Sequence, residues 1–170
     1  MLFRSIGDHV DSFLFIGSGT FHPVGLLLSS KKPVIAADPY TTTVKKQELE
    51  DLKDTILRQR YGAIANSKNA KRFGILVGTK KGQQRIKRAN EIQKLLHSLD
   101  KKSMVISLDY FSPTPLQGFG DIDCFVSTAC PRIAIDDMKQ YKTPILTFTE
   151  LQIAFDILSY DSYRFDEITD

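Results

Sequence analysis

The chain has 170 residues, enough for one domain of ordinary size or two small ones. Hydrophobic residues make up 42% and charged residues 25%, which is typical of a globular protein and excludes a disordered or fibrous chain. The formal charge of +3 is too small an excess to indicate binding to nucleic acid or to an anionic membrane unless it is concentrated in one place.

The N-terminal sequence and the cysteines indicate the compartment. The longest apolar run, around residues 24–28, is far shorter than the ~20 residues that a membrane span needs. The first residues, MLFRSIGDHV, contain no apolar core of a secretory signal. Two cysteines, Cys124 and Cys130, do not make a disulfide framework. We therefore expect a cytoplasmic protein that does not associate with membranes.

Short β-branched and aromatic runs alternate with amphipathic stretches along the chain. The runs predict six strands, at residues 12–16, 33–37, 73–78, 104–108, 124–128 and 144–147. Apolar residues at helical spacing predict two long helices, at 44–64 and 83–99. This alternation favours an α/β fold in which Rossmann-like parallel sheets are flanked by helices.

The predicted helix at 44–64 also divides the chain. Two strands and a short helix precede it, too few for a stable sheet, so residues 1–42 are interpreted as the C-terminal part of a middle α/β domain. Residues 43–70 would form a connecting helix, and residues 71–160 one complete C-terminal α/β domain. The acidic residues 161–170 are expected to form a mobile or loosely packed tail.

Ligands in open α/β sheets gather at the carboxyl ends of strands, and two glycine-containing segments follow predicted strands. In the first, residues 17–25, Pro23 suits the first turn of a helix and places His22 near its N-cap. A purely structural turn with a half-exposed histidine fits this segment equally well. In the second, residues 78–84, backbone N–H groups could hold an anion, although glycine is common in such turns for steric reasons alone.

A basic cluster lies at the start of the second predicted helix. It consists of Lys80, Lys81, Arg85, Lys87 and Arg88. It could contact RNA or a nucleotide, but no aromatic residues for base stacking are interleaved with it. A solvated surface explains the cluster better, so direct binding to nucleic acid is not expected.

The segment STACPRIAID, residues 127–136, is the most informative in the chain. Cys130 follows a predicted strand, and Pro131 suits the first position of a helix. The pKa of a thiol at a helix N-terminus is lowered, which favours the thiolate that binds metal or attacks carbon. Arg132 would oppose the helix dipole at a cost of ~0.3–1 kcal/mol, which indicates that it holds an anion such as a carboxylate. Asp136, one turn later, could fix the arginine or contact the ligand; an inert buried Cys130 is the alternative.

The two cysteines are too far apart to act together. Six residues of strand would separate Cys124 from Cys130 by ~20 Å. A disulfide needs Cα atoms within ~7 Å, and a shared metal ion is equally out of reach. Cys124 is therefore expected to be a core residue at the start of a strand.

Five segments together resemble the archaeal diphthamide synthase family: FHPxG at 21–25, KPVxAxDP at 32–39, GT at 78–79, TACPRxxID at 128–136 and KxPILTxxE at 142–150. The resemblance implies related α/β domains around a [4Fe–4S] cluster held by one cysteine from each of three domains. It also implies cleavage of S-adenosylmethionine to a 3-amino-3-carboxypropyl radical. That group is added to a histidine of translation elongation factor 2, in the first step of diphthamide biosynthesis.

Carried over by motif, Cys130 corresponds to the cluster cysteine of the last domain, and Arg132 and Asp136 would line the S-adenosylmethionine pocket. His22 would approach this pocket from the middle domain. The other two cluster cysteines have no counterpart, because only about the C-terminal half of the family pattern is matched.

The resemblance therefore implies the C-terminal portion of an iron–sulfur transferase that does not catalyse alone. Its expected partners are translation elongation factor 2 and either a second copy in a homodimer or a missing N-terminal half. The alternative is a truncated, non-catalytic α/β module that binds S-adenosylmethionine, another nucleotide or a partner subunit.

Overall fold

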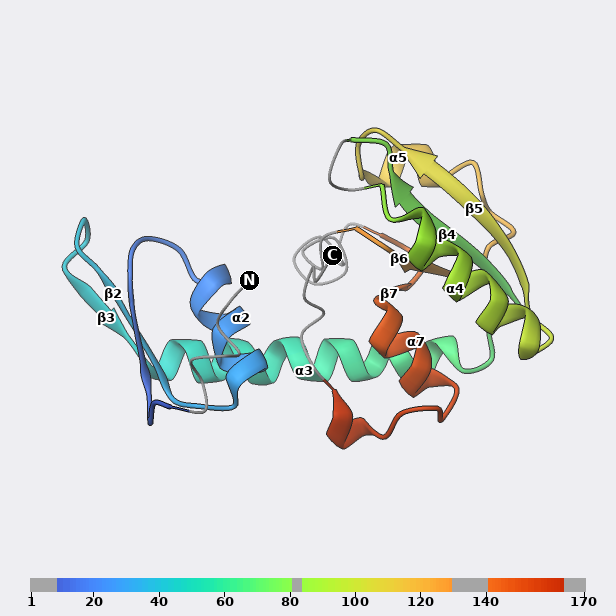
Figure 1. Ribbon diagram of the computed structural model, residues 1–170. Helices are drawn as coiled ribbons and strands as arrows, with labels where there is room; N and C mark the ends of the chain where they lie inside the picture. The colour runs from blue at the N-terminus through green and yellow to red at the C-terminus, as the bar shows by residue number, and fades with distance from the viewer. Residues whose placement is uncertain (1–8, 81–83, 130–140, 164–170) are drawn as a thin grey trace. The chain divides into compact units, whose positions relative to one another are not determined.

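The computed structural model describes residues 9–80, 84–129 and 141–163, and the chain falls into two units (Figure 1). The amino-terminal unit ends at Gln59, and the carboxy-terminal unit begins at Arg60. This boundary lies within a single helix, α3 (Gln47–Ser67). None of the helices in the described ranges is long and apolar enough to cross a membrane.

The amino-terminal unit is built on a three-stranded sheet. β1 (Phe13–Ile16) runs parallel to β2 (Val34–Asp38), and β2 pairs antiparallel with β3 (Thr43–Lys45). α2 (Phe21–Ser30) connects β1 to β2 and buries an apolar stripe made of Val24, Leu26, Leu27 and Leu28. The strand–helix–strand unit expected at the start of the chain is therefore present, with one additional strand.

That additional strand corrects the prediction of a helix beginning at residue 44. Val44 and Lys45 lie in β3, and α3 begins only at Gln47. β-Branched side chains at residues 41–44 favour extended backbone. Thr42 takes a left-handed conformation, with φ 52°, in the turn that returns the chain beside β2. The apolar residues that follow have helical spacing, and for this reason the predicted helix began too early and included part of the hairpin.

The carboxy-terminal unit contains a four-stranded parallel sheet in the order β5–β4–β6–β7. Its strands are β4 (Arg72–Gly78), β5 (Lys102–Leu108), β6 (Cys124–Ser127) and β7 (Ile145–Leu146). From Phe73 to Gly78 every residue of β4 is buried. A continuous hydrophobic run is what a central parallel strand requires, because helices and loops cover both of its faces.

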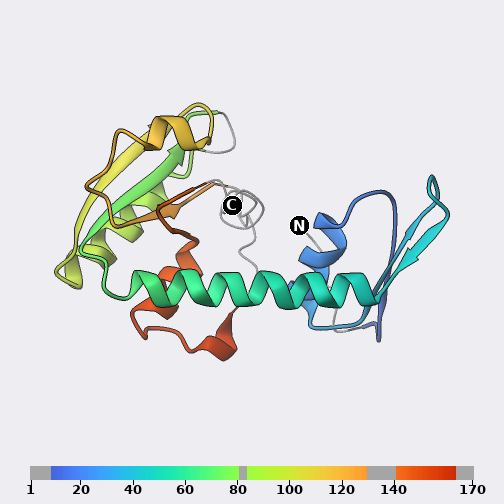
Figure 2. The same cartoon turned by 180° about the vertical axis from the view of Figure 1, so that it is seen from behind.

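Helices pack on the strands of this sheet. α4 (Ile86–Ser98) packs on β4 and β5, in front of them in Figure 1 and behind them in Figure 2. α5 (Pro113–Leu116) precedes β6, and α7 (Phe148–Ala154) contacts β6 and β7. A parallel sheet with flanking helices confirms the expected α/β fold class.

A buried ion pair ties α3 to α7 inside the carboxy-terminal unit. Arg60 and Glu150 both have fully buried side chains. The Nε of Arg60 donates to Oε1 of Glu150 at 2.7 Å, and its Nη2 donates to Oε2 at 2.5 Å and to the carbonyl of Ile145 at 2.7 Å. The bidentate geometry and the extra carbonyl acceptor compensate for the cost of removing these charges from water.

The same carboxylate caps α7. The Oε2 of Glu150 accepts the backbone N–H of Thr147 at 2.8 Å, and the Thr147 hydroxyl accepts the N–H of Glu150, which makes a capping box. Oε1 also accepts the hydroxyl of Tyr163 at 3.1 Å. Tyr163 is buried, so the expectation of a loosely packed tail from residue 161 is wrong at this position.

Candidate functional site

The strand order of the carboxy-terminal unit creates a topological switch point between β4 and β6. From β4 the chain crosses to β5 on one side, and from β5 it returns to β6 on the other side. All four strands are parallel, so their carboxyl ends lie at one edge. Ligands of open α/β sheets bind at such an edge, where the strand order reverses. This edge is therefore the candidate site.

Polar groups follow β4 and β5 at this edge. The hydroxyl of Thr79 donates to the carboxylate of Asp109, and the N–H of Thr79 donates to the carbonyl of Leu108 at 3.1 Å. The Nζ of Lys80 lies 4.0 Å from the centroid of the Tyr110 ring, within range of a cation–π contact. The edge thus carries an oriented hydroxyl, a carboxylate and a cation that could meet a polar ligand.

The end of β6 is held firmly against β4. Both the N–H and the hydroxyl of Thr128 donate to the carbonyl of Leu76, at 3.0 and 2.9 Å. The N–H of Ala129 donates to the hydroxyl of Ser127 at 3.2 Å. Ser127, Thr128 and Ala129 are all buried. These bonds fix the backbone up to residue 129 beside the switch point.

Three of the four predicted site residues lie outside the described residues. They are Cys130, Arg132 and Asp136. Cys130 is the next residue after Ala129, so its position in the sequence relative to the end of β6 is known. The contacts of all three side chains stay predictions.

His22 is the one predicted site residue within the described ranges, and it belongs to the amino-terminal unit. It lies in the first turn of α2, directly after the N-cap residue Thr20 and Phe21, as expected. The side chain is exposed, and its ring centroid lies 6.3 Å from that of Phe15 and 5.5 Å from that of Phe21. These contacts orient the imidazole at the carboxyl end of β1.

The carboxyl ends of β1 and β2 are joined by a hydrogen bond beside His22. The hydroxyl of Ser18 donates to Oδ1 of Asp38 at 3.2 Å, and the N–H of Tyr40 donates to the same oxygen at 2.9 Å. Desolvation raises the pKa of Asp38, but the hydrogen bonds from Tyr40, Ser18 and Thr41 outweigh it and bring the pKa below its ordinary value. Asp38 therefore stays a carboxylate at neutral pH.

Cys124 does not fit the role of a metal ligand. It is fully buried at the start of β6, with its Sγ 3.2 Å from the Oγ of Ser67, which confirms it as a core residue. Burial raises the pKa of the Cys124 thiol to about 12, so the thiolate that binds metal does not form. Across the described part of the chain, no group of three His, Cys, Asp or Glu side chains gathers as a metal site. A [4Fe–4S] cluster, usually held by four cysteines, does not fit these residues alone.

Two members of the predicted basic cluster, Lys80 and Arg88, make internal contacts. Arg88 pairs with Glu91 at 2.9 Å, and its guanidinium lies 5.0 Å from the centroid of the Phe148 ring. Lys80 contacts Tyr110, as described above, and Lys81 lies outside the described residues. The interpretation of the cluster as a solvated surface stays a prediction.

Sequence reasoning missed two features that the structure contains. Arg60 lies at four-residue spacing from Ile56 and Ile64, which places it on the buried stripe of α3. A charged residue on the buried face of a helix needs a partner of opposite charge, so this spacing is a sequence signal of a buried ion pair. The second missed feature is a cavity at the amino ends of β4 and β5, where a pair of cations begins each strand: Lys71 and Arg72, and Lys101 and Lys102.

Comparison with protein families places most of the chain in one group. Residues 3–164 match a family model described as "Putative diphthamide synthesis protein". The chain is 37% identical over 158 residues to the 2-(3-amino-3-carboxypropyl)histidine synthase of Pyrococcus horikoshii and 36% identical over 160 residues to that of Methanocaldococcus jannaschii. Each match covers 93% of the chain, but only 44% and 46% of the respective synthase. The chain thus spans less than half the length of these relatives.

The fold agrees with that of a solved relative. The crystal structure of Dph2 from Pyrococcus horikoshii with a 4Fe-4S cluster superposes with a TM-score of 0.82 at 37% identity. The superposition covers 93% of this chain and 44% of that one. A human relative, subunit 1 of the corresponding synthase, is 26% identical over 156 residues.

Proposed function

The chain belongs to the diphthamide synthesis protein family, and we propose that it is the C-terminal portion of an iron–sulfur 2-(3-amino-3-carboxypropyl)histidine synthase. The complete enzyme would transfer the 3-amino-3-carboxypropyl group of S-adenosylmethionine to a histidine of translation elongation factor 2, in the cytoplasm where that factor works. The observation that carries this proposal is the match of 93% of the chain to 44% of an archaeal synthase.

In this proposal Cys130 supplies one ligand of the cluster. The chain contains two cysteines, and burial excludes Cys124. Cys130 comes three residues after the end of β6 in the sequence, and β6 borders the switch point, where ligands of such sheets bind. Since one thiolate cannot hold a cluster, the remaining ligands come from outside this chain, either from the part of the synthase that it does not span or from another subunit.

The neighbouring residues would bind S-adenosylmethionine. Arg132 suits its carboxylate, because a guanidinium donates two parallel hydrogen bonds to such a group. Asp136 would orient Arg132 or contact the ligand. His22, exposed near the carboxyl end of β1, would contact S-adenosylmethionine. A non-catalytic binding module is the second candidate, favoured by the lack of a metal-binding cluster among the described residues.

A chimera tests the proposal. The part of the Pyrococcus horikoshii synthase that matches this chain is replaced by the chain, and transfer of radiolabel from S-adenosylmethionine to elongation factor 2 is measured. We expect transfer by the chimera and by its Cys124→Ala variant, but none by Cys130→Ala. A folded chimera that binds S-adenosylmethionine but transfers nothing, beside an active parent enzyme, would support the binding module instead.

A further inference from the structure

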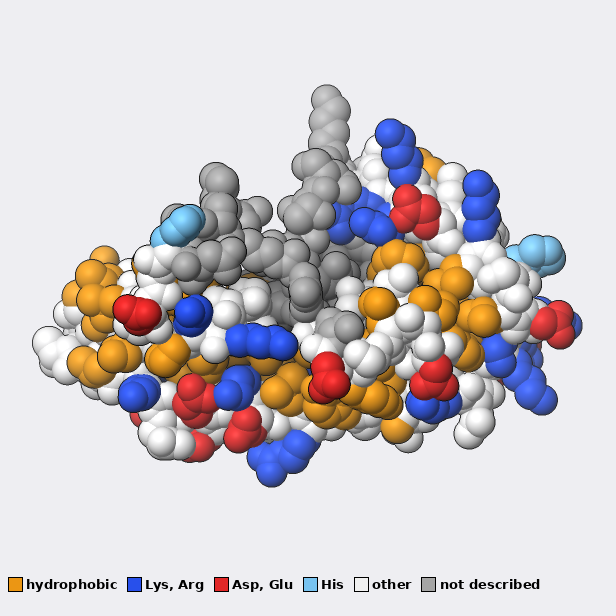
Figure 3. Space-filling model, turned by 60° about the horizontal axis from the view of Figure 1, so that its bottom comes forward, with side chains coloured by type: hydrophobic (Ala, Val, Ile, Leu, Met, Phe, Trp, Pro, Cys, Tyr) orange, Lys and Arg blue, Asp and Glu red, His pale blue; other side chains and the backbone are white. Residues whose placement is uncertain are grey.

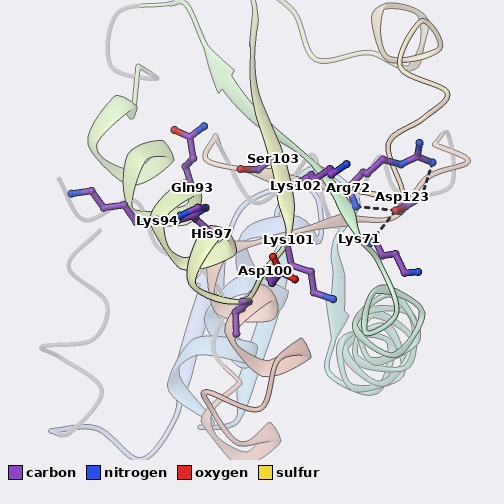
Figure 4. Close-up of a pocket in the computed structure, with 11 residues that line it drawn as sticks. Lys71, Arg72, Gln93, Lys94, His97, Asp100, Lys101, Lys102, Ser103 and Asp123 are labelled. Atoms are coloured by element: carbon purple, nitrogen blue, oxygen red, sulfur yellow. Dashed lines mark hydrogen bonds and ion pairs between the residues drawn. The ribbon is translucent and has the colours of Figure 1, made fainter.

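The amino ends of the parallel strands carry a second feature, which the proposed reaction does not use. A cavity of about 1120 Å³ opens there, between the first residues of β4 and β5 and the last turns of α4 (Figure 4). We call it the amino-edge cavity. Because the four strands are parallel, it lies at the opposite edge of the sheet from the switch point. Any ligand it binds is therefore distinct from one at the carboxyl edge.

Sheet pairing brings the cationic residues of this cavity together. Arg72 and Lys102 are paired in the register of β4 and β5, and the N–H of Lys102 donates to the carbonyl of Lys71 at 3.0 Å. On the other side of β4, the N–H of Asp123 donates to the carbonyl of Arg72 at 2.9 Å. The cluster is thus built by regular backbone hydrogen bonds of three strands, which hold its members in fixed positions.

The lining of the cavity has an excess of positive charge. Five of its eleven lining residues are Lys or Arg and two are Asp. The excess of three equals the formal net charge of the whole chain, +3. An excess of three charges attracts anions only weakly when it is spread over a surface. In one concave region the same excess attracts anions more strongly and speeds their association.

One of the two carboxylates serves to orient a cation. Oδ2 of Asp123 accepts the N–H groups of Lys71 and Arg72 at 3.0 and 2.9 Å, and its Oδ1 lies 3.5 Å from Nη2 of Arg72 (Figure 4). The two backbone hydrogen bonds hold the pKa of Asp123 below its usual value. In contrast, Lys71, Lys94 and Lys102 form no ion pair with any described residue, so their charges are available to a ligand.

The lining excludes other classes of ligand. Leu99 is its one apolar residue, whereas sites for small molecules and cofactors are mostly apolar. Its one aromatic ring is the imidazole of His97, and it contains no Phe, Tyr or Trp on which a nucleic-acid base could stack more extensively. Gln93 and Ser103 can in addition donate and accept hydrogen bonds with the backbone of a polypeptide segment. A helix C-terminus favours nearby cations such as Lys94, but this does not account for Lys71 and Lys102, which lie at strand ends.

We propose that the amino-edge cavity binds an acidic segment of a partner protein, a run of Asp and Glu side chains that pair with Lys71, Lys94 and Lys102. Such a contact would guide docking and fix orientation more than it would add affinity, because exposed charges act chiefly on the association rate. It goes beyond the proposed transfer reaction and does not depend on it, since it needs neither the cluster nor Cys130.

Fluorescence anisotropy with labelled deca-glutamate as the probe tests this proposal on the full chain. The variant Lys71→Glu/Lys102→Glu is expected to weaken binding about tenfold or more, and Lys71→Gln/Lys102→Gln by an intermediate factor. Both lysines are exposed, and circular dichroism verifies that the variants fold. The matched control is Lys46→Glu/Lys87→Glu, which makes the same charge change at exposed lysines outside the cavity and is expected to bind like the parent.

Three results would overturn the proposal. The first is a parent chain that does not bind deca-glutamate at low salt. The second is a control variant that loses as much binding as the cavity variant, which would show that only net charge matters. The third is tighter binding of labelled deca-uridine through Lys71 and Lys102, which would assign the cavity to nucleic acid.

Discussion

The two sheets of this chain differ in how far they are covered. In the carboxy-terminal unit, all of β6 and β7 and most of β4 are buried. In the amino-terminal unit, Leu14 and Ile16 of β1 and Val44 of β3 are 65%, 68% and 71% exposed. Strand register places these three on one face, because Ile16 and Val44 both pair with Ala37. Figure 3 shows hydrophobic side chains at the surface of this unit, at the left.

The difference indicates which unit is structurally complete. An apolar sheet face is stabilised only when another layer covers it, at roughly 25 cal/mol per Å² of buried apolar surface. In the carboxy-terminal sheet such layers cover β4, β6 and β7, while the edge strand β5 leaves Met104 and Val105 45% and 44% exposed. One face of the amino-terminal sheet has no such layer among the described residues. We propose that the amino-terminal unit is the end of a middle domain whose remaining strands and helices belong to the part of the synthase that this chain does not span.

The largest effect is expected from breaking the buried ion pair of the complete unit. Arg60→Met leaves the Glu150 carboxylate buried without its partner, which should lower the free energy of unfolding by about 3–5 kcal/mol. Urea unfolding followed by circular dichroism measures this loss. The control is Lys68→Ala, which removes the exposed pair with Asp156 and should cost less than about 1 kcal/mol. Equal losses in the two variants would contradict the account.

Gly74 of β4 provides a second test of close packing in this unit. A Cβ at this position would lie 2.6 Å from Cδ1 of Phe125, so Gly74→Ala should destabilise the protein by about 1–3 kcal/mol. Gly62 of α3 is the matched control, since a Cβ there meets nothing within 4 Å. Gly62→Ala should stabilise the protein by about 0.5–1 kcal/mol through helix propensity. Thermal unfolding measures both effects: the unfolding temperature should fall for Gly74→Ala and rise for Gly62→Ala.

A smaller effect on stability is expected from the titration of Asp123 at low pH. The pKa of Asp123 is lower in the folded chain than in the unfolded chain, so its contribution to stability is present above the unfolded value of about 4 and is lost as the pH falls through the folded value. Asp123→Asn should therefore flatten the dependence of the urea midpoint on pH below about 4. An unchanged slope would show that the backbone hydrogen bonds of Lys71 and Arg72 do not depend on this charge.

The smallest effect on stability is expected on the open face of the amino-terminal sheet. The triple variant Leu14→Ser/Ile16→Ser/Val44→Thr replaces exposed side chains, so the free energy of unfolding should change by no more than about 0.5 kcal/mol per site. Binding of a hydrophobic dye and concentration-dependent self-association should both fall, because the apolar patch is removed. A large loss of stability would mean that this face is already covered within the chain.

Much of the fold could be predicted from the sequence because its signals are local. The buried run of β4 and the amphipathic stripe of α4 predicted both elements to within a few residues. β3 was missed because three residues of strand next to a helix carry no periodicity of their own. The spacing of Arg60 on the buried stripe of α3 signals a buried cation, but its partner could not be identified, because Glu150 is 90 residues away in the sequence.

The candidate site was predictable only in part. The strand that precedes Cys130 in the sequence could be predicted, and the structure has β6 beside β4 at the switch point, whereas the role of Cys130 itself stays a prediction. The amino-edge cavity could not be inferred, because Lys71 and Lys102 become neighbours only through the pairing of β4 with β5. Strand register, unlike strand location, depends on contacts between distant segments.

Iron and acid-labile sulfide per chain, after anaerobic reconstitution of the chain alone, test the central claim most directly. The account predicts far less iron than one [4Fe–4S] cluster in the parent chain, because Cys130 is its single available thiolate and Cys124 is buried. The Cys124→Ala variant should give the same low value. A full cluster that persists in Cys130→Ala would contradict the account, since the ligands would then lie elsewhere in this chain.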